Sequence, residues 1–194
     1  YISAAPNVPL SIIEKFVSAK KEYIINTLNN FNKSRTEKHA MQYVSGENVT
    51  ILGKNLRIMI VKDSNEYVYS DGIYIFIHVK RSDYYNRKKN LFIQWMNQYC
   101  QEVYYEILCN AYKKFIPYGV KFPQLKLRNM AYRWGSCQPN KGIITLNKRL
   151  IEAPKCCIEY VVFHELCHCI HPNHSPNFYM LLKIMIPEWK ENKI

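Results

Sequence analysis

The sequence predicts an α+β fold in which a small β-rich lobe precedes a second, helix-containing domain. Three observations indicate this arrangement: paired strand signals in the front half, one long helical stripe in the middle, and short strands followed by two helices at the back. A hydrophobic content of 48%, with 16 Tyr and 8 Phe, is enough for a sizeable core. We place the lobe at residues 1–84 and the second domain at residues 85–194.

The lobe begins with a predicted helix and continues as strands. Ser11-Ile12-Ile13-Glu14 has the pattern of a capping box, and apolar residues continue at helical spacing to Phe31. Two pairs of strand-like runs follow, each around a turn signal: 48–52 and 56–61 around Gly53-Lys54-Asn55, then 66–70 and 73–79 around Asp71-Gly72. We therefore expect a small, largely antiparallel sheet with one helix.

The second domain starts with a backing helix over residues 85–116, whose apolar residues recur at threes and fours. Pro117-Tyr118-Gly119 is typical of its end. We then expect a strand over 124–132, a turn at 133–137 and a strand over 143–147. A helix carrying the metal motif follows, and Ser175-Pro176 is the predicted start of a last helix, which runs to Pro187.

The strongest chemical signal is His164-Glu165-Leu166-Cys167-His168, an H-E-x-x-H pattern. On a helix, residues four apart lie on one face, so both imidazoles can reach one divalent ion while Glu165 serves as a carboxylate base. A catalytic zinc takes three protein ligands and keeps a fourth position for water. His174 is the predicted third ligand, six residues after His168.

Alternatives to this ligand set remain at this stage. His171 is the other candidate third ligand, but on a continuing helix it would point away from His164. The spacing also fits the metzincin signature, although the chain has His171-Pro172 where that signature has a Gly. The simplest alternative is a surface helix with no metal. The buried stripe expected beside the histidines, Ile158, Val161, Val162, Leu166 and Cys169, argues against it.

The seven cysteines favour a reducing compartment, because their number is odd and Cys156 and Cys157 are adjacent. We therefore expect a cytoplasmic protein. Cys169 falls on the expected core stripe and Cys167 nearly opposite, so both are interpreted as small packing residues rather than metal ligands. No apolar run approaches the roughly 18 residues of a membrane span, so no membrane partner is expected.

The net charge of +12 implies attraction to polyanions. Nucleic acid is a possible partner, but the basic residues are scattered along the chain. Solvated lysines without any polyanionic partner are an equally good explanation.

The back half resembles the YgjP-like metallopeptidase family, relatives of the SprT and Spartan-type zinc proteases. The resemblance rests on an ordered series of motifs: Arg133-Trp134-Gly135-Ser136-Cys137, Ile144-Thr145-Leu146-Asn147, Leu150 to Pro154, Tyr160 to His168, Asn173-His174-Ser175 with Phe178, and Pro187. It implies a zincin-like, minigluzincin-type core with a backing helix, a small mixed sheet and the H-E-x-x-H helix. It also implies zinc on His164, His168 and His174, with Glu165 as base.

The expected function is zinc-dependent hydrolysis of a protein or peptide substrate, in which Glu165 assists attack by a zinc-bound water. Arg133, Ser136 or a Tyr could help to stabilise the oxyanion. If residues 143–147 form the edge strand that aligns substrate, Asn147 is a substrate contact; a strand-end Asn that caps a turn is the alternative. The rival function is a non-catalytic basic module that binds nucleic acid and is held together by a zinc closed by Cys137.

Overall fold

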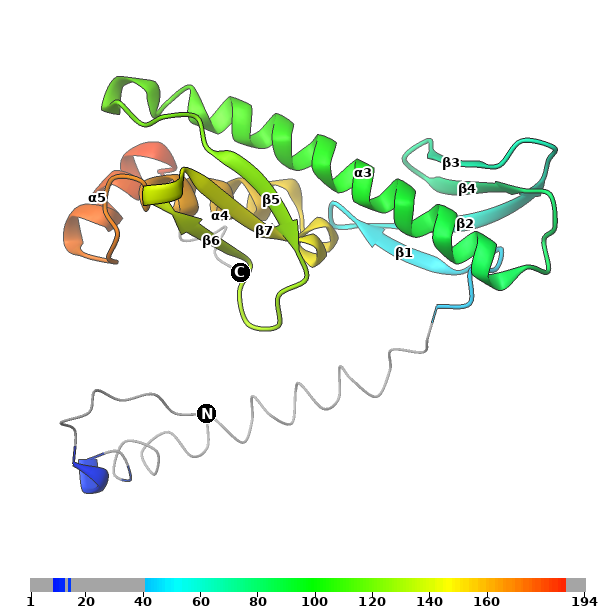
Figure 1. The fold of residues 1–194 in the computed structure, drawn as a ribbon, viewed down its shortest axis with the longest axis horizontal. Coiled ribbons are helices and arrows are strands. Elements are labelled where there is room, and N and C mark those ends of the chain that lie inside the picture. The colour runs from blue at the N-terminus through cyan, green and yellow to red at the C-terminus, as the bar shows by residue number, and fades with distance from the viewer. Residues whose placement is uncertain (1–8, 13, 15–40, 188–194) are drawn as a thin grey trace. The chain divides into compact units, whose positions relative to one another are not determined.

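The computed structural model describes residues 9–12, 14 and 41–187 (Figure 1). The chain divides into two compact units, Tyr1–Met41 and Gln42–Ile194. Residues 10–12 and 14 are helical, so Ser11 lies inside the first helix rather than at its N-cap. The rest of that predicted helix lies outside the described residues. The domain boundary at residue 84 stays a prediction.

The first sheet contains β1 (Asn48–Ile51), β2 (Lys54–Lys62), β3 (Tyr67–Ser70) and β4 (Tyr74–Val79) in the order β1-β2-β4-β3 (Figure 1). Both predicted hairpins are present and antiparallel, whereas β2 and β4 pair in parallel, so the sheet is mixed rather than wholly antiparallel. Ile75, Ile77 and Val79 alternate along β4 and are fully buried, which places β4 inside the sheet. Tyr67 and Tyr69 are exposed and belong to β3, which is an edge strand of this sheet.

The turn between β1 and β2 fixes this sheet against the second half of the same unit. Leu52 and Gly53 form a two-residue loop with φ of 50° and 76°, the geometry of a type I′ turn, instead of the three-residue loop expected. Their amides donate to the carbonyls of Ile151 at 2.7 Å and Glu152 at 3.2 Å. The loop therefore packs on the segment that leads into the metal-motif helix.

Helix α3 (Tyr85–Tyr112) is the predicted backing helix, and it ends four residues earlier than expected. It contacts β3 and β4 near one end and the metal-motif helix further along (Figure 1). The chain then forms a 3₁₀ turn, η1 (Ile116–Tyr118), which stops at Gly119 with φ of 72°. Pro117-Tyr118-Gly119 therefore ends this 3₁₀ turn and not the long helix, whose end it was predicted to mark.

The second sheet contains β5 (Gln124–Arg128), β6 (Gly135–Gln138) and β7 (Ile143–Asn147) in the order β5-β7-β6. β5 and β7 are parallel and β6 is antiparallel to β7, so this sheet is mixed, as expected. Two expectations were wrong: residues 135–138 are a strand rather than part of a turn, and β6 rather than β7 is the edge next to the metal helix. Residues 144–147 of β7 are buried on both faces of the sheet, so this strand needs neighbours on both sides.

Two 3₁₀ turns and two helices complete the fold: η2 (Pro139–Lys141), η3 (Lys148–Glu152), α4 (Lys155–Cys167) and α5 (Pro176–Met185). The predicted N-cap of α5 is confirmed, since the Ser175 hydroxyl accepts from the Phe178 amide at 3.4 Å. Within the described ranges, no helix has the length and apolarity that crossing a membrane requires.

The metal-motif helix α4 is buried along the predicted stripe, including Ile158, Val162 and Leu166. The expectation for the two cysteines was reversed: Cys167 is fully buried and Cys169 is half-buried. The reason is that α4 ends at Cys167, so Cys169 no longer follows helical spacing and points elsewhere.

Candidate metal centre

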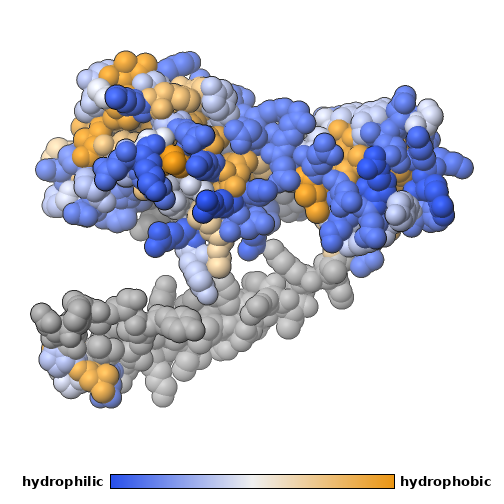
Figure 2. All heavy atoms as spheres, in the orientation of Figure 1, coloured by the Kyte–Doolittle hydropathy of each residue, from blue (hydrophilic) through white to orange (hydrophobic). Residues whose placement is uncertain are grey.

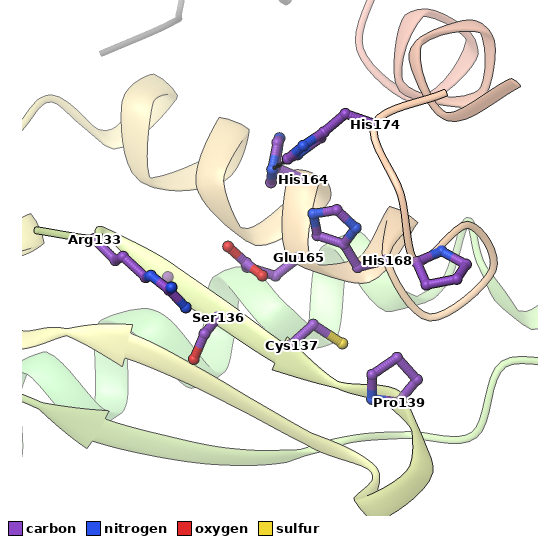
Figure 3. A pocket seen from close by; sticks show the side chains of 10 residues that line it. Arg133, Ser136, Cys137, Pro139, His164, Glu165, His168 and His174 are labelled. Carbon is purple, nitrogen blue, oxygen red and sulfur yellow. Dashed lines mark hydrogen bonds between the residues drawn. The ribbon is translucent and has the colours of Figure 1, made fainter. Parts of the chain in front are cut away.

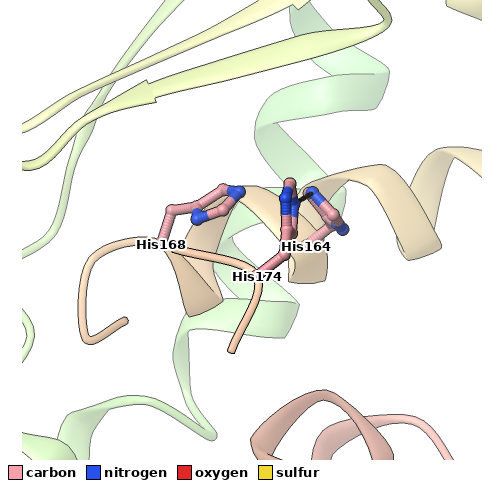
Figure 4. A group of neighbouring side chains, drawn as sticks. All are labelled: His164, His168 and His174. Carbon is pink, nitrogen blue, oxygen red and sulfur yellow. Dashed lines mark hydrogen bonds between the residues drawn. The ribbon is translucent and has the colours of Figure 1, made fainter. Parts of the chain in front are cut away.

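Three imidazoles converge where α4 ends (Figure 4). His164 lies in the last turn of α4, His168 is its C-cap, and His174 lies in the loop before α5. Their ligand atoms all lie within 4.8 Å of one another, and the Nε2 atoms of His164 and His174 are 3.0 Å apart. Two nitrogens that bind one tetrahedral zinc at about 2.05 Å would be about 3.3 Å apart, so these residues fit a zinc ion.

The orientation of His168 supports the same ligand set. Its Nδ1 lies 3.1 Å from the carbonyl oxygen of His171, which can only accept, so Nδ1 carries the proton and Nε2 keeps its lone pair. Burial lowers the pKa of His168, which favours the neutral form that binds metals. His171 therefore contributes its backbone carbonyl, whereas its side chain is not in the cluster.

Packing from α5 holds the cluster in place. The ring of Phe178 is fully buried, and its centroid lies 4.9, 4.6 and 4.8 Å from those of His164, His168 and His174. The Ser175 cap fixes where α5 begins and thereby where Phe178 lies. The loop from α4 to α5, which carries His174, is thus held at its start by the bond between His168 and the His171 carbonyl and at its end by the Ser175 cap.

Glu165 lies between α4 and the edge strand β6 (Figure 3). Only 6% of the residue is exposed, and burial raises the pKa of its carboxyl to about 7, with nearby Arg133 acting in the opposite direction. The backbone of β6 passes directly over this carboxylate at Gly135. A Cβ at Gly135 would lie 2.6 Å from Oε1 of Glu165, so only Gly leaves room for it there.

A cleft of about 400 Å³ opens beside the cluster, lined by Arg133, Gly135, Ser136, Cys137, Pro139, His164, Glu165, His168, Pro172 and His174. One wall is the β6 strand, which pairs only with β7 within its sheet. Arg133 is exposed on this wall. The side chain of Ser136 points away from Glu165, because alternate residues of a strand face opposite sides (Figure 3).

Asn147 lies outside the cleft and is 3% exposed. Its side-chain amide donates to the carbonyls of Met130 at 2.8 Å and Arg133 at 2.9 Å, and its side-chain oxygen accepts from the Arg149 amide at 3.1 Å. These bonds hold the loop before β6 and cap η3. They favour the interpretation of Asn147 as a strand-end residue that caps a turn over its interpretation as a substrate contact.

Cys137 does not join the histidine cluster. Its sulfur lies 3.5 Å from that of Cys169, and this contact, followed by burial, raises the pKa of the Cys137 thiol. Among the described residues, His164, His168 and His174 are the one set of three or more His, Cys, Asp or Glu side chains arranged to hold a metal. The described part of the chain thus offers three protein ligands rather than four.

Gly135 is the functional position that the sequence reasoning missed. A single Gly inside a strand often marks a close approach by another group. Because residues 133–137 were interpreted as a turn, that signal was attributed to turn geometry. The alternation of the strand would have placed Gly135 and Cys137 on one face and Ser136 on the other.

A family model and a solved structure show what the chain is similar to. The model of the family described as YgjP-like, metallopeptidase domain, matches residues 1–194. None of the curated proteins compared with the chain matches it. Among solved structures, the chain is similar to the metallopeptidase zymogen of Pyrococcus abyssi abylysin, with 21% identity and a TM-score of 0.41, over 46% of this chain and 87% of that one.

Proposed function

Because the chain belongs to the YgjP-like metallopeptidase family, we propose that it is a zinc-dependent peptidase that cleaves protein or peptide substrates. The observation that carries the proposal is the convergence of three histidines beside a buried carboxylate, at a cleft, with no fourth ligand in the described part of the chain. A structural zinc site would be closed by a fourth side chain.

In the proposed mechanism, His164, His168 and His174 hold the zinc. When bound, zinc would lower the pKa of a coordinated water and polarise the scissile carbonyl. Glu165 accepts a proton from the attacking water at its carboxylate and delivers it to the leaving amine. Gly135 keeps this carboxylate in place from the β6 side. The Arg133 guanidinium on the cleft wall is our candidate for stabilising the developing oxyanion.

The substrate is proposed to lie along β6. This strand lines the cleft, and no strand among the described residues pairs with its outer edge, so an extended peptide can add to it through backbone hydrogen bonds. Such binding is sequence-tolerant and favours unfolded segments over folded surfaces. Ser136 would then contribute its backbone rather than its hydroxyl.

The test is a cleavage assay on an unfolded protein with the zinc-loaded chain and with Glu165→Gln. The substitution keeps the three imidazoles and the shape of the side chain but removes the base. We expect unchanged zinc stoichiometry and a loss of cleavage of at least 100-fold. Equal cleavage by the variant would remove Glu165 from the mechanism, and no zinc in either protein would refute the metal site.

We propose nucleic-acid binding as a second function, supported by the charge distribution. Residues 113–151 contain nine Lys and Arg and no Asp or Glu, and Tyr132 and Trp134 are exposed in the same segment. Hydrophilic side chains predominate on the face seen in Figure 2. Cations beside exposed aromatic rings suit single-stranded nucleic acid. Binding should weaken steeply with salt; no detectable binding to DNA or RNA at low salt would refute it.

A further inference from the structure

A pair of cysteine side chains lies beside the cleft and is not used by the proposed mechanism. Cys137 belongs to β6 and lines the cleft, whereas Cys169 directly follows the ligand His168. Their sulfur atoms are 3.5 Å apart, and both side chains are half-buried. A disulfide has an S–S distance of about 2.05 Å, so a closing movement of about 1.5 Å would join them.

From this juxtaposition we propose that Cys137 and Cys169 form a reversible disulfide that switches the metal site off. With a peroxide as oxidant, one thiol is oxidised to a sulfenic acid and releases water. The second thiol then displaces a second water as the S–S bond forms. Two thiols and one peroxide thus give one disulfide and two waters, and an added dithiol reverses the change. The effect on hydrolysis rests on the proposed peptidase function, whereas the disulfide itself does not.

The bond would disturb the site from both of its ends. At one end, Cys169 is covalently next to His168, whose Nδ1 bond to the His171 carbonyl sets the direction of its other nitrogen. A pull on Cys169 therefore turns a metal ligand. At the other end, Cys137 is two residues from Gly135, which already touches the Glu165 carboxylate with no room for one more carbon. A movement of β6 toward α4 therefore displaces the base.

The other cysteines provide matched controls. Cys156 is exposed near the start of α4 and lies next to Cys157. An oxidant can therefore reach this thiol, and neither cysteine lines the cleft. Cys167 is fully buried. Cys169→Ser removes one sulfur of the proposed bond and leaves every residue of the proposed mechanism in place. Cys156→Ser removes an accessible thiol that the proposal does not use.

The experiment treats the reduced protein, residues 1–194, with hydrogen peroxide and maps disulfides by mass spectrometry. Zinc affinity and cleavage of an unfolded protein are measured before treatment, after it, and after reduction with dithiothreitol. We expect a Cys137–Cys169 linked peptide in the wild type and in Cys156→Ser, and none in Cys169→Ser. Oxidation should weaken zinc binding by at least tenfold and slow cleavage about 100-fold, with recovery on reduction, only where the bond forms.

Two outcomes would overturn the proposal: absence of the linked peptide in oxidised wild type, or its presence without any change in zinc affinity. A protein that does not cleave even when reduced would refute the peptidase function alone. In that case the disulfide map and the zinc affinity would still decide on the switch.

Discussion

At the scale of single residues, the most demanding contact in the site joins Gly135 to Glu165. The carboxylate of a proposed base is held between a helix and the bare backbone of a strand, where the position of one Cβ decides whether it fits. The contact also explains the burial that raises the pKa of Glu165 to about 7. A small displacement in such a place has a large effect on rate, because the base must meet the attacking water at hydrogen-bond distance.

Gly135→Ala should therefore reduce cleavage by about 100-fold while zinc stays bound, because the added carbon displaces Glu165 but touches none of the three imidazoles. The measurement is cleavage of an unfolded protein together with zinc stoichiometry. Gln138→Ala, an exposed position on the same strand, is the control and should behave like the wild type. Normal cleavage by Gly135→Ala would show that Glu165 has more freedom than the structure indicates.

The two histidines that compete for the role of third ligand can be separated by a stability measurement. Zinc at 100 times its dissociation constant stabilises a protein by about 2.7 kcal/mol if it binds only the folded state. His174→Ala should lose most of this zinc-dependent rise in melting temperature. His171→Ala should keep it, because His171 contributes a backbone carbonyl that the substitution leaves in place. The reverse pattern would reassign the third ligand to His171.

At the scale of elements, the segments with strong local signals were predicted and those that depend on partners were not. The capped α5, the periodic α3 and the hairpin around Asp71-Gly72 carry their signals in a few neighbouring residues. The parallel pairing of β2 with β4 depends on which strand buries its apolar face, which short-range patterns do not encode. The convergence of the three histidines was predictable because their spacing is a property of one helix and its next loop.

The strand β6 shows the limit most clearly. Its four residues begin with Gly135 and directly follow Trp134, so local chemistry favours a turn over a strand. Pairing with β7 and contact with α4 override that preference. With β6 as the edge, Asn147 on the central strand β7 becomes a support for the cleft rather than part of it.

Asn147→Ala should consequently destabilise the protein by about 1–3 kcal/mol, because it removes three part-buried hydrogen bonds, to two carbonyls and one amide. Chemical denaturation measures this loss. The expected kinetic result at a temperature where the variant is folded is a modest loss of cleavage with little change in KM. A large rise in KM with unchanged stability would instead restore Asn147 as a substrate contact.

At the scale of the whole molecule, one chain combines a histidine site with a strongly uneven distribution of charge. The basic stretch of residues 113–151 includes all three strands of the sheet beside the metal centre and reaches the cleft at Arg133. The cleft wall therefore carries positive charge whatever the partner is. A polyanion bound along this stretch would lie next to the peptide-binding edge proposed for β6, which makes joint binding of the two partners testable in one assay.

The central claim is an open metal site with three histidine ligands, and X-ray absorption at the zinc edge tests it most directly. The zinc-loaded, reduced protein should show only nitrogen and oxygen neighbours at about 2.0–2.1 Å. The spectrum of His174→Ala, if it still holds zinc, should lose imidazole scattering. A sulfur neighbour at about 2.3 Å would mean that Cys137 or Cys169 closes the site, and it would contradict the hydrolytic account in favour of a structural zinc.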